Sequence, residues 1–558
     1  MSDDMKLLAE TNAETINEEQ STFVEQENIS SQIKTPTLYD THIKENFHIY
    51  GLASILYGIL YVFCMYQNDA GITFPLFVAG TIGYIAFVLH KLEMKLKKDS
   101  RFYLISMLLL GVSTFCTDDY RIIFCNKIGI FLLAICVVLD TVYDTKKWQL
   151  GKYLGVIGQV SVMSIREIGT PFFDAVWYCK NKLGKKHSKY LYLMIGIGIT
   201  IPVFAVVFVL LSSADAVFRN VTNRVLSDFS AVDLYVMTIM FFFMALLSYC
   251  IVVYLGKKEV KEEISETPKW DSLIAIPVTG ALSIMYLVFS GIQIVYLFMG
   301  KMQLPIGYTY AEYAREGFFQ LLAVSIINLI IVLAGLYLFK SSKVLKAVLV
   351  IMSLCTFIMI ASSALRMMIY IQYYYLTFLR ILVLWSLLVL FLIFIGVVAY
   401  IAKAEFPLFR YSIVVFTCLY MGLSFSHPDY WIAKVNLEST KEIRSEFFKG
   451  EAYSDYSLLA GLSADAAPVL VEWIVEEGYT TDSYFIDTMT YDSYRILNEI
   501  PLIYDVENAE ACLTEQKTWC AYRYLRNLRE NCYGQSFREF NFSRFGADYD
   551  VLLSESKR

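Results

Sequence analysis

The feature of this sequence that most constrains its fold is a series of continuous apolar blocks, each roughly 18–25 residues long, separated by short polar breaks. An α-helix needs about 20 apolar residues to cross the hydrocarbon core of a bilayer. The blocks lack the alternating pattern of a transmembrane β-strand, so they predict helices and not a barrel. We expect about eleven membrane helices, at residues 48–66, 71–89, 102–117, 121–143, 190–211, 233–255, 271–298, 317–339, 344–369, 379–402 and 408–426.

The composition agrees with a polytopic membrane protein. Of the 558 residues, 57% are hydrophobic and 18% are charged, whereas soluble chains have about 45–50% and about 25%. Acidic residues gather at the ends: residues 1–40 hold nine acidic and two basic side chains, and residues 427–558 hold 23 and 13. The predicted fold class is an all-α polytopic transmembrane helix bundle at 48–426, with a disordered acidic cytoplasmic tail at 1–47 and a soluble helical domain at 427–558.

Lysine and arginine in the short loops predict the orientation, because positive charge stays on the cytoplasmic side. Alternate loops are basic, and the intervening ones are short or acidic, as at Asp118-Asp119. The basic loops carry Lys91, Lys95, Lys97, Lys98 and Arg101; Lys146, Lys147 and Lys152; Lys257 and Lys258; Lys340, Lys343 and Lys346; and Lys403 and Arg410. We expect a multi-pass cell-membrane protein, without a cleaved signal peptide, whose N-terminus is cytoplasmic and whose C-terminus is extracytoplasmic. This orientation of the C-terminus requires an odd number of helices.

A cytoplasmic segment at 144–189 carries apolar residues at helical spacing, with lysines and arginines around them. This amphipathic pattern fits a helix lying on the anionic inner leaflet. A linker helix packed on the bundle fits the same pattern equally well.

Ionisable and polar side chains at membrane depth are costly and therefore mark candidate functional residues. Most of these side chains fall on the predicted outer side, at the ends of the membrane helices or in the loop that enters the eighth one. They form a candidate polar centre of Asp215, Tyr310, Glu312, Arg315, Glu316, Asn328, Arg366 and Arg380. Pairing of these carboxylates and arginines could fix helix register, bind a ligand or ion, or support catalysis.

No catalytic motif is visible, neither a zinc-protease HExxH, nor a GxSxG elbow, nor a phosphate loop. The five histidines are scattered, and no CxxC pair occurs, so no metal site or cofactor is predicted. A basic stripe with interleaved aromatic residues is also absent, which argues against nucleic-acid binding.

The C-terminal domain shows helical periodicity and few strand signals. We expect helices around 433–448, 453–461, 465–477, 481–498, 506–531 and 543–553. Cys512, Cys520 and Cys532 are either free buried thiols or include one disulfide. Cys512 and Cys520 would lie about 12 Å apart in one helix, too far to bridge, and a link from Cys520 to Cys532 needs a turn between them.

Several segments resemble a bacterial multi-pass membrane family of unknown function, the domain of unknown function 4173, which is related to that numbered 4153. The similar segments are 212–218 (SSADAVF), 308–319 (YTYAEYAREGFF), 363–367 (SALRM), 374–380 (YYLTFLR), 432–436 (IAKVN) and 459–470 (LAGLSADAAPVL). Tyr375 stands where a glycine is expected, and Ile306 where an acidic residue is common. The resemblance implies a Gram-positive-type cell-membrane protein and brings no known activity, substrate or catalytic residue.

Three functional hypotheses follow from these observations. The first is a membrane scaffold or sensor-type protein whose outer domain meets an envelope protein or a wall component. The second is a transporter of a small solute or ion that uses the candidate polar centre; no inverted repeat supports it. The third is an intramembrane enzyme acting on lipid-linked substrates.

Overall fold

The computed structural model describes residues 37–98, 100–143, 150–182, 231–257, 270–295, 310–440, 456–479, 509–532 and 536–547, with isolated residues between 145 and 218. Some side chains lie outside this description, among them those of residues 310–316 and 509–515. Within the described residues every named element is helical, which confirms the all-α fold class. The chain divides into two compact units. The first contains Met1–Ile59, His90–Glu93 and Gly158–Lys261, and the second contains Leu60–Leu89, Met94–Ile157 and Glu262–Arg558.

Nine helices in the described part of the chain are long and apolar enough to cross a membrane. They are α2 (Phe47–Met65), α3 (Thr73–Lys91), α5 (Tyr120–Val142), α10 (Ala231–Lys257), α11 (Ser272–Gln293), α12 (Tyr310–Leu338), α13 (Lys343–Tyr374), α14 (Phe378–Ala402) and α15 (Leu408–Phe425). A tenth, α4 (Ser100–Cys116), is apolar but shorter, at 17 residues. These ten helices match ten of the eleven predicted spans, and the predicted span at 190–211 falls mostly outside the described residues.

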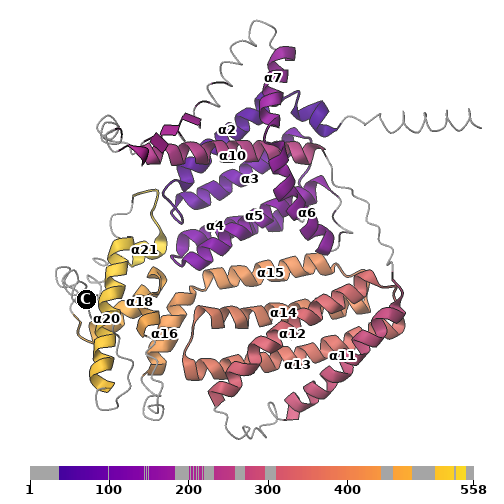
Figure 1. Ribbon diagram of the computed structural model, residues 1–558, viewed down its shortest axis with the longest axis vertical. Coiled ribbons are helices and arrows are strands. Elements are labelled where there is room, and N and C mark those ends of the chain that lie inside the picture. The colour runs from indigo at the N-terminus through magenta and orange to yellow at the C-terminus, as the bar shows by residue number, and fades with distance from the viewer. Residues whose placement is uncertain are drawn as a thin grey trace, which may run out of the picture. The chain divides into compact units, whose positions relative to one another are not determined.

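In the second unit, α13 packs against α11, α12 and α14 (Figure 1). α14 packs on α15, and α15 packs on α4, which pairs with α5. One stripe of α13 is buried, with Leu345, Leu349, Met352, Cys355 and Met359 spaced three or four residues apart. That spacing places the five side chains on one face of the helix and explains why α13 faces its neighbours along its length.

The outward faces of the membrane helices are apolar. Leu56 of α2 is 58% exposed, Ile284 of α11 is 67% exposed and Ile330 of α12 is 61% exposed. Hydrocarbon chains of lipid can cover such side chains, whereas water would leave them unfavourably solvated. Together with the helix lengths, this identifies a multi-pass membrane protein.

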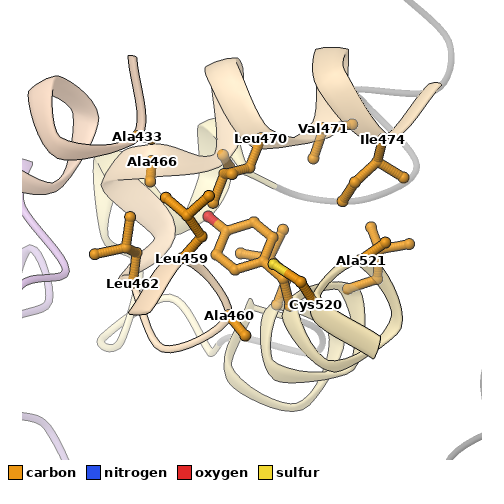
Figure 2. Packing of buried hydrophobic residues seen from close by; sticks show 14 of the residues in the cluster. Ala433, Leu459, Ala460, Leu462, Ala466, Leu470, Val471, Ile474, Cys520 and Ala521 are labelled. Atoms are coloured by element: carbon orange, nitrogen blue, oxygen red, sulfur yellow. The ribbon is translucent and has the colours of Figure 1, made fainter. Parts of the chain in front are cut away.

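The C-terminal domain is built from α16 (Pro428–Thr440), α17 (Tyr456–Leu459), η5 (Ala464–Ala466), α18 (Ala467–Glu476), α20 (Ala509–Cys532) and α21 (Phe542–Gly546). It has its own apolar core, in which Leu459, Leu470 and Ile474 converge on Cys520 and Ala521 of α20 (Figure 2). Cys520 and Cys532 are both buried within this one continuous helix, and the side chain of Cys512 lies outside the described residues.

Three helix junctions in the described part of the second unit use left-handed backbone at a residue other than glycine. Gln67, between α2 and α3, has φ 51°. His427, between α15 and α16, has φ 48°, and Tyr375, between α13 and α14, has φ 66°. The conformation at Tyr375 favours glycine, which gives a physical reason for the glycine that the resemblance led us to expect there. Helix α16 begins at Pro428, five residues before the predicted start at 433, because proline is favoured in the first helical turn.

The first unit places α10 beside the segment predicted to be amphipathic. Helix α6 (Leu150–Met163) is followed by η3 (Ser164–Glu167) and α7 (Thr170–Lys182). Both η3 and α7 pack on α10, as does the short π-helix η1 (Tyr39–Ile43). The part of the predicted tail that the structure describes, residues 37–47, therefore contains a helical turn packed on a membrane helix.

Candidate functional site

Four aspartates meet where the turn between α4 and α5 contacts the C-terminal domain. Asp118 and Asp119 form this turn, Asp429 lies in the first turn of α16, and Asp465 lies in η5. We name these four residues the carboxylate cluster. Asp119, Asp429 and Asp465 are buried, and Asp118 is largely buried. Buried carboxylates are costly unless they are paired and hydrogen-bonded, so their partners decide what the cluster does.

Asp465 accepts hydrogen bonds from several elements at once. Its Oδ2 accepts the Thr117 hydroxyl at 2.5 Å and lies 3.2 Å from Nδ1 of His427. Its Oδ1 accepts the Asp118 backbone N–H at 2.8 Å and the Ser543 hydroxyl. One carboxylate therefore joins the α4–α5 turn, the start of α16 and the start of α21.

The other three carboxylates complete the connection. Asp118 accepts Nε of Arg544 at 2.5 Å and the Ala464 backbone N–H at 3.1 Å. Arg121 donates to both oxygens of Asp119, at 2.7 and 2.8 Å, and also to Asp429. Such bidentate arginine–carboxylate pairs fix orientation as well as adding binding energy.

The pKa values follow from these partners. Burial would raise the pKa of Asp465, but hydrogen bonds from His427, Ser543 and Thr117 outweigh it and hold the pKa below its ordinary value. The hydrogen bond to Asp465 raises the pKa of His427, although burial opposes this. At Asp118, burial prevails over the Arg544 guanidinium and raises the pKa of the carboxyl. The docked state therefore favours a protonated histidine beside an ionised Asp465.

Backbone contacts extend the same interface to the loop between α2 and α3. The side-chain amide of Asn68 (Nδ2) donates to the Arg538 carbonyl at 2.8 Å, and the Ile72 backbone N–H donates to the Phe540 carbonyl at 2.8 Å. Gly71 permits this approach, because a Cβ there would lie 2.1 Å from the Arg538 carbonyl oxygen. The C-terminal domain is thus held to two separate loops of the bundle.

A third loop is held by an asparagine of α16. Asn436 accepts the Leu376 N–H at 2.7 Å and donates to the Leu376 carbonyl at 2.9 Å, so its side chain imitates a backbone pair. Leu376 and its neighbour Phe378 also pack on the apolar core of the domain. The junction of α13 and α14 is therefore part of the interface.

The chemistry of the cluster suits attachment. Ser543, Thr117 and His427 all bond to Asp465, whereas a hydrolytic triad needs the histidine between the hydroxyl and the acid. No group of three or more His, Cys, Asp or Glu side chains could hold a metal ion in the part of the chain that the structure describes. The arrangement joins the C-terminal helices to the α4–α5 turn.

The residues of the predicted polar centre are only partly described. The side chains of Tyr310, Glu312, Arg315 and Glu316 lie outside the described residues. Asp215 belongs to the first unit, is exposed, and accepts the Phe218 N–H at 3.4 Å. The pairing of these carboxylates with arginines stays a prediction.

Arg366 of α13 belongs to a buried polar group with Gln293 of α11 and Ser362 of α13. Its guanidinium donates to Oε1 of Gln293 at 3.4 Å, and the Ser362 hydroxyl donates to the same oxygen at 2.7 Å. The side chain is 7% exposed. A Cβ on Gly317 of α12 would lie 2.1 Å from Nη1, so any larger residue there would displace the guanidinium.

Asn328 and Arg380 have other neighbours. Asn328 is fully buried and donates its amide to the Thr356 hydroxyl at 3.0 Å. The guanidinium of Arg380 donates to the carbonyls of Tyr374 and Tyr375 and lies 4.5 Å from the centre of the Tyr370 ring. Arg380 thus closes the α13–α14 junction that contacts the C-terminal domain.

The first unit holds a different buried carboxylate. Asp174 of α7 is 1% exposed and accepts the hydroxyls of Tyr39 at 2.6 Å and Tyr249 at 2.9 Å. Burial raises its pKa, and the two tyrosine hydrogen bonds oppose this. Nearby, Lys257 pairs with Glu167 at 2.7 Å. These contacts join η1, α7 and the cytoplasmic end predicted for α10.

Helix content and apolar outward faces define a polytopic, all-α membrane protein. The chain belongs to the family described as "Domain of unknown function (DUF4153)", whose model matches residues 104–473. The matched region includes all four aspartates of the carboxylate cluster and ends before Ser543 and Arg544. None of the curated proteins and none of the solved structures matches the chain.

Proposed function

We propose that this chain is a membrane scaffold or sensor-type protein whose C-terminal domain meets an envelope protein or a wall component on the extracytoplasmic side. The carboxylate cluster carries the proposal. It fastens a domain with its own core to the α4–α5 turn, and Asn436 and the Asn68–Arg538 contact add the α13–α14 junction and the α2–α3 loop, so a load or partner on the domain acts directly on the ends of membrane helices. A flexible tether would separate the two parts instead.

Exposed side chains of the domain offer places for a partner. Trp431 of α16 is 47% exposed, and Glu472 of α18 is also exposed. A photo-crosslinking residue at either position should give one defined adduct in whole cells, whereas the same residue at the buried Leu470 should give none. Absence of an adduct at both exposed positions, in protein that inserts normally, would count against a scaffold role.

We also propose which side of the membrane each terminus faces and that the chain belongs to a narrower group within its family. Basic alternate loops support a cytoplasmic N-terminus and an extracytoplasmic C-terminus. The segments 308–319 and 459–470 support membership of the narrower group numbered 4173, and with it residence in a bacterial cell membrane.

Thiol labelling of intact cells tests this orientation. The native Cys520 and Cys532 are too deeply buried to report, so an exposed thiol is introduced by Glu472→Cys. We expect a membrane-impermeant maleimide to label this variant before lysis. Lys95→Cys, in a loop predicted to be cytoplasmic, is the matched control and should be labelled only after lysis. The reverse pattern would overturn the orientation and place the partner in the cytoplasm.

A transporter is the second candidate, and the buried polar residues of α11, α12 and α13 favour it. Gln293, Ser362 and Arg366 form one polar group, and Asn328 pairs with Thr356 in the same three helices. Polar side chains at this depth are characteristic of solute pathways, although they also fix helix register.

Ligand-dependent stability distinguishes the two roles. If the group around Arg366 binds a solute, inorganic ions or small carboxylates should raise the melting temperature of the purified protein. Arg366→Gln should abolish that shift, while Lys434→Gln, a surface charge of the C-terminal domain, should keep it. Equal shifts in the two variants would leave the polar group with a purely structural role.

A further inference from the structure

The segment 536–547 exposes large aromatic side chains, whereas most aromatic side chains among the other described residues of the C-terminal domain are buried or half-buried. Phe537 is 80% exposed, Phe542 is 62% exposed and Phe545 is 50% exposed. Leaving a phenylalanine side chain in water instead of burying it costs about 2 kcal/mol. Three such side chains within nine residues therefore need a cover.

The backbone of this segment is fixed against the ends of membrane helices. The Arg538 and Phe540 carbonyls accept hydrogen bonds from Asn68 and Ile72, in the loop between α2 and α3. Asn541 donates to the Ala70 carbonyl at 2.9 Å and to the Thr117 carbonyl at 3.0 Å. The segment thus lies at the level where α2 and α4 end.

Side-chain contacts reach further along the same helices. The Arg538 guanidinium donates to the Phe63 carbonyl, at 3.3 Å, in the last turn of α2. Phe63 itself is 51% exposed and belongs to the apolar face of α2. The Phe540 ring lies 6.0 Å from the ring of Phe115, in the last turn of α4. The exposed phenylalanines therefore continue the apolar surface of the bundle at its rim.

We propose that the segment 536–547 is a membrane-surface anchor, in which Phe537 and Phe542 enter the boundary between lipid headgroups and acyl chains. The occupant of this surface is phospholipid, because the ends of α2 and α4 mark the edge of the hydrocarbon layer. Aromatic side chains are favoured at that depth, and Arg538 can direct its charge toward the headgroups. The anchor requires only that the chain spans a membrane, whatever partner the domain has.

Depth-dependent quenching tests the anchor in the full-length protein reconstituted into phosphatidylcholine vesicles. The fluorescence added by Phe537→Trp, relative to wild type, should be quenched strongly by lipid with brominated acyl chains and weakly by aqueous iodide. Val475→Trp is the control, since Val475 is exposed on α18, which packs on α16 and α20. Its added fluorescence should show the opposite pattern.

Phe542→Trp is a second reporter in case Phe537→Trp inserts poorly. Strong bromolipid quenching of either reporter supports the anchor. Strong iodide quenching of both, or protection of both from iodide without bromolipid quenching, would overturn it, because the segment would then face water or another copy of the protein.

Discussion

Two buried aspartates in this protein are satisfied in different ways. Asp465 accepts hydrogen bonds from a histidine, two hydroxyls and a backbone amide, and these donors hold its pKa below the ordinary value in spite of burial. Asp174 accepts two tyrosine hydroxyls, and burial prevails, so its pKa is raised. The same side chain is therefore stabilised in its charged form at one site and penalised in that form at the other.

The difference in pKa between Asp465 and Asp174 indicates which of the two contacts depends on charge. A tyrosine hydroxyl can donate or accept a hydrogen bond, so Tyr39 and Tyr249 can bond to a neutral side chain at position 174 as well as to a carboxylate. The backbone N–H at Asp465 can only donate, and a protonated His427 needs an anion. Attachment of the C-terminal domain thus depends on charge, whereas the contact that joins η1, α7 and α10 depends mainly on shape and hydrogen bonding.

The largest effect is expected from Asp465→Asn, which removes the charge without opening a cavity. The NH2 group of the asparagine would face hydrogen-bond donors that now bond to one carboxylate oxygen. The free energy that holds the C-terminal domain to the bundle should therefore fall by about 3 kcal/mol. Amide hydrogen exchange of α18 in nanodiscs would measure this as a lower free energy of local opening. Unchanged protection of α18 would mean that the carboxylate cluster does not hold the domain.

Gly71→Ala tests the same attachment through the backbone. The new Cβ would meet the Arg538 carbonyl oxygen at 2.1 Å and Cα of Glu539 at 2.8 Å, so the two loops must separate, at a cost of about 2 kcal/mol. Gly83→Ala is the matched control in α3, because nothing lies within 4 Å of its Cβ. Protease susceptibility of the C-terminal domain should rise in the first variant alone. Equal susceptibility would show that the α2–α3 loop contributes nothing to attachment.

Hydropathy predicted most of the membrane fold because a lipid-facing helix must be apolar along its whole length. It also placed the α4–α5 turn, since Asp118 and Asp119 interrupt an apolar run. The predicted start of α16, at residue 433, was wrong because Pro428 begins the helix before its apolar periodicity starts.

The carboxylate cluster was not predicted. Asp465 lies 347 residues after Asp118, and an aspartate before a helix ordinarily caps that helix or faces water. Nothing in the local sequence signals that the two turns meet. Arginines within apolar segments were predicted instead, because the cost of burying them is evident from the neighbouring apolar residues. The similarity of residues 459–470 to a known family was the one signal at Asp465.

Asp174→Asn should have a smaller effect than Asp465→Asn. One tyrosine hydroxyl can rotate to accept a hydrogen bond from the new NH2 group while the other still donates to the amide oxygen. The free energy of local opening should therefore fall by only about 1 kcal/mol. Hydrogen exchange of α7 would measure it. A loss as large as that at Asp465 would remove the distinction between the two carboxylates.

The smallest effect concerns pH. His427 has a raised pKa when docked, so its contribution is complete below its unfolded pKa and is lost as pH rises through the raised value. Asp465 has a lowered pKa, so its contribution is present above its ordinary value and is lost as pH falls through the lowered one. Asp174 has a raised carboxyl pKa, so its contribution declines in the acidic range as pH rises and is constant once the carboxyl is ionised.

Raising the pH from about 6 to about 9 should therefore loosen α18 and leave α7 unchanged. Hydrogen exchange, corrected for the intrinsic effect of pH, would compare the two helices in one sample. His427→Asn is the control, because asparagine tolerates the left-handed backbone at this position, can still donate to Asp465, and does not titrate. Loss of the pH response in this variant would assign it to His427. A response that persists would have to come from Asp118 or another group of the carboxylate cluster, and the charge dependence of attachment would then not pass through the histidine.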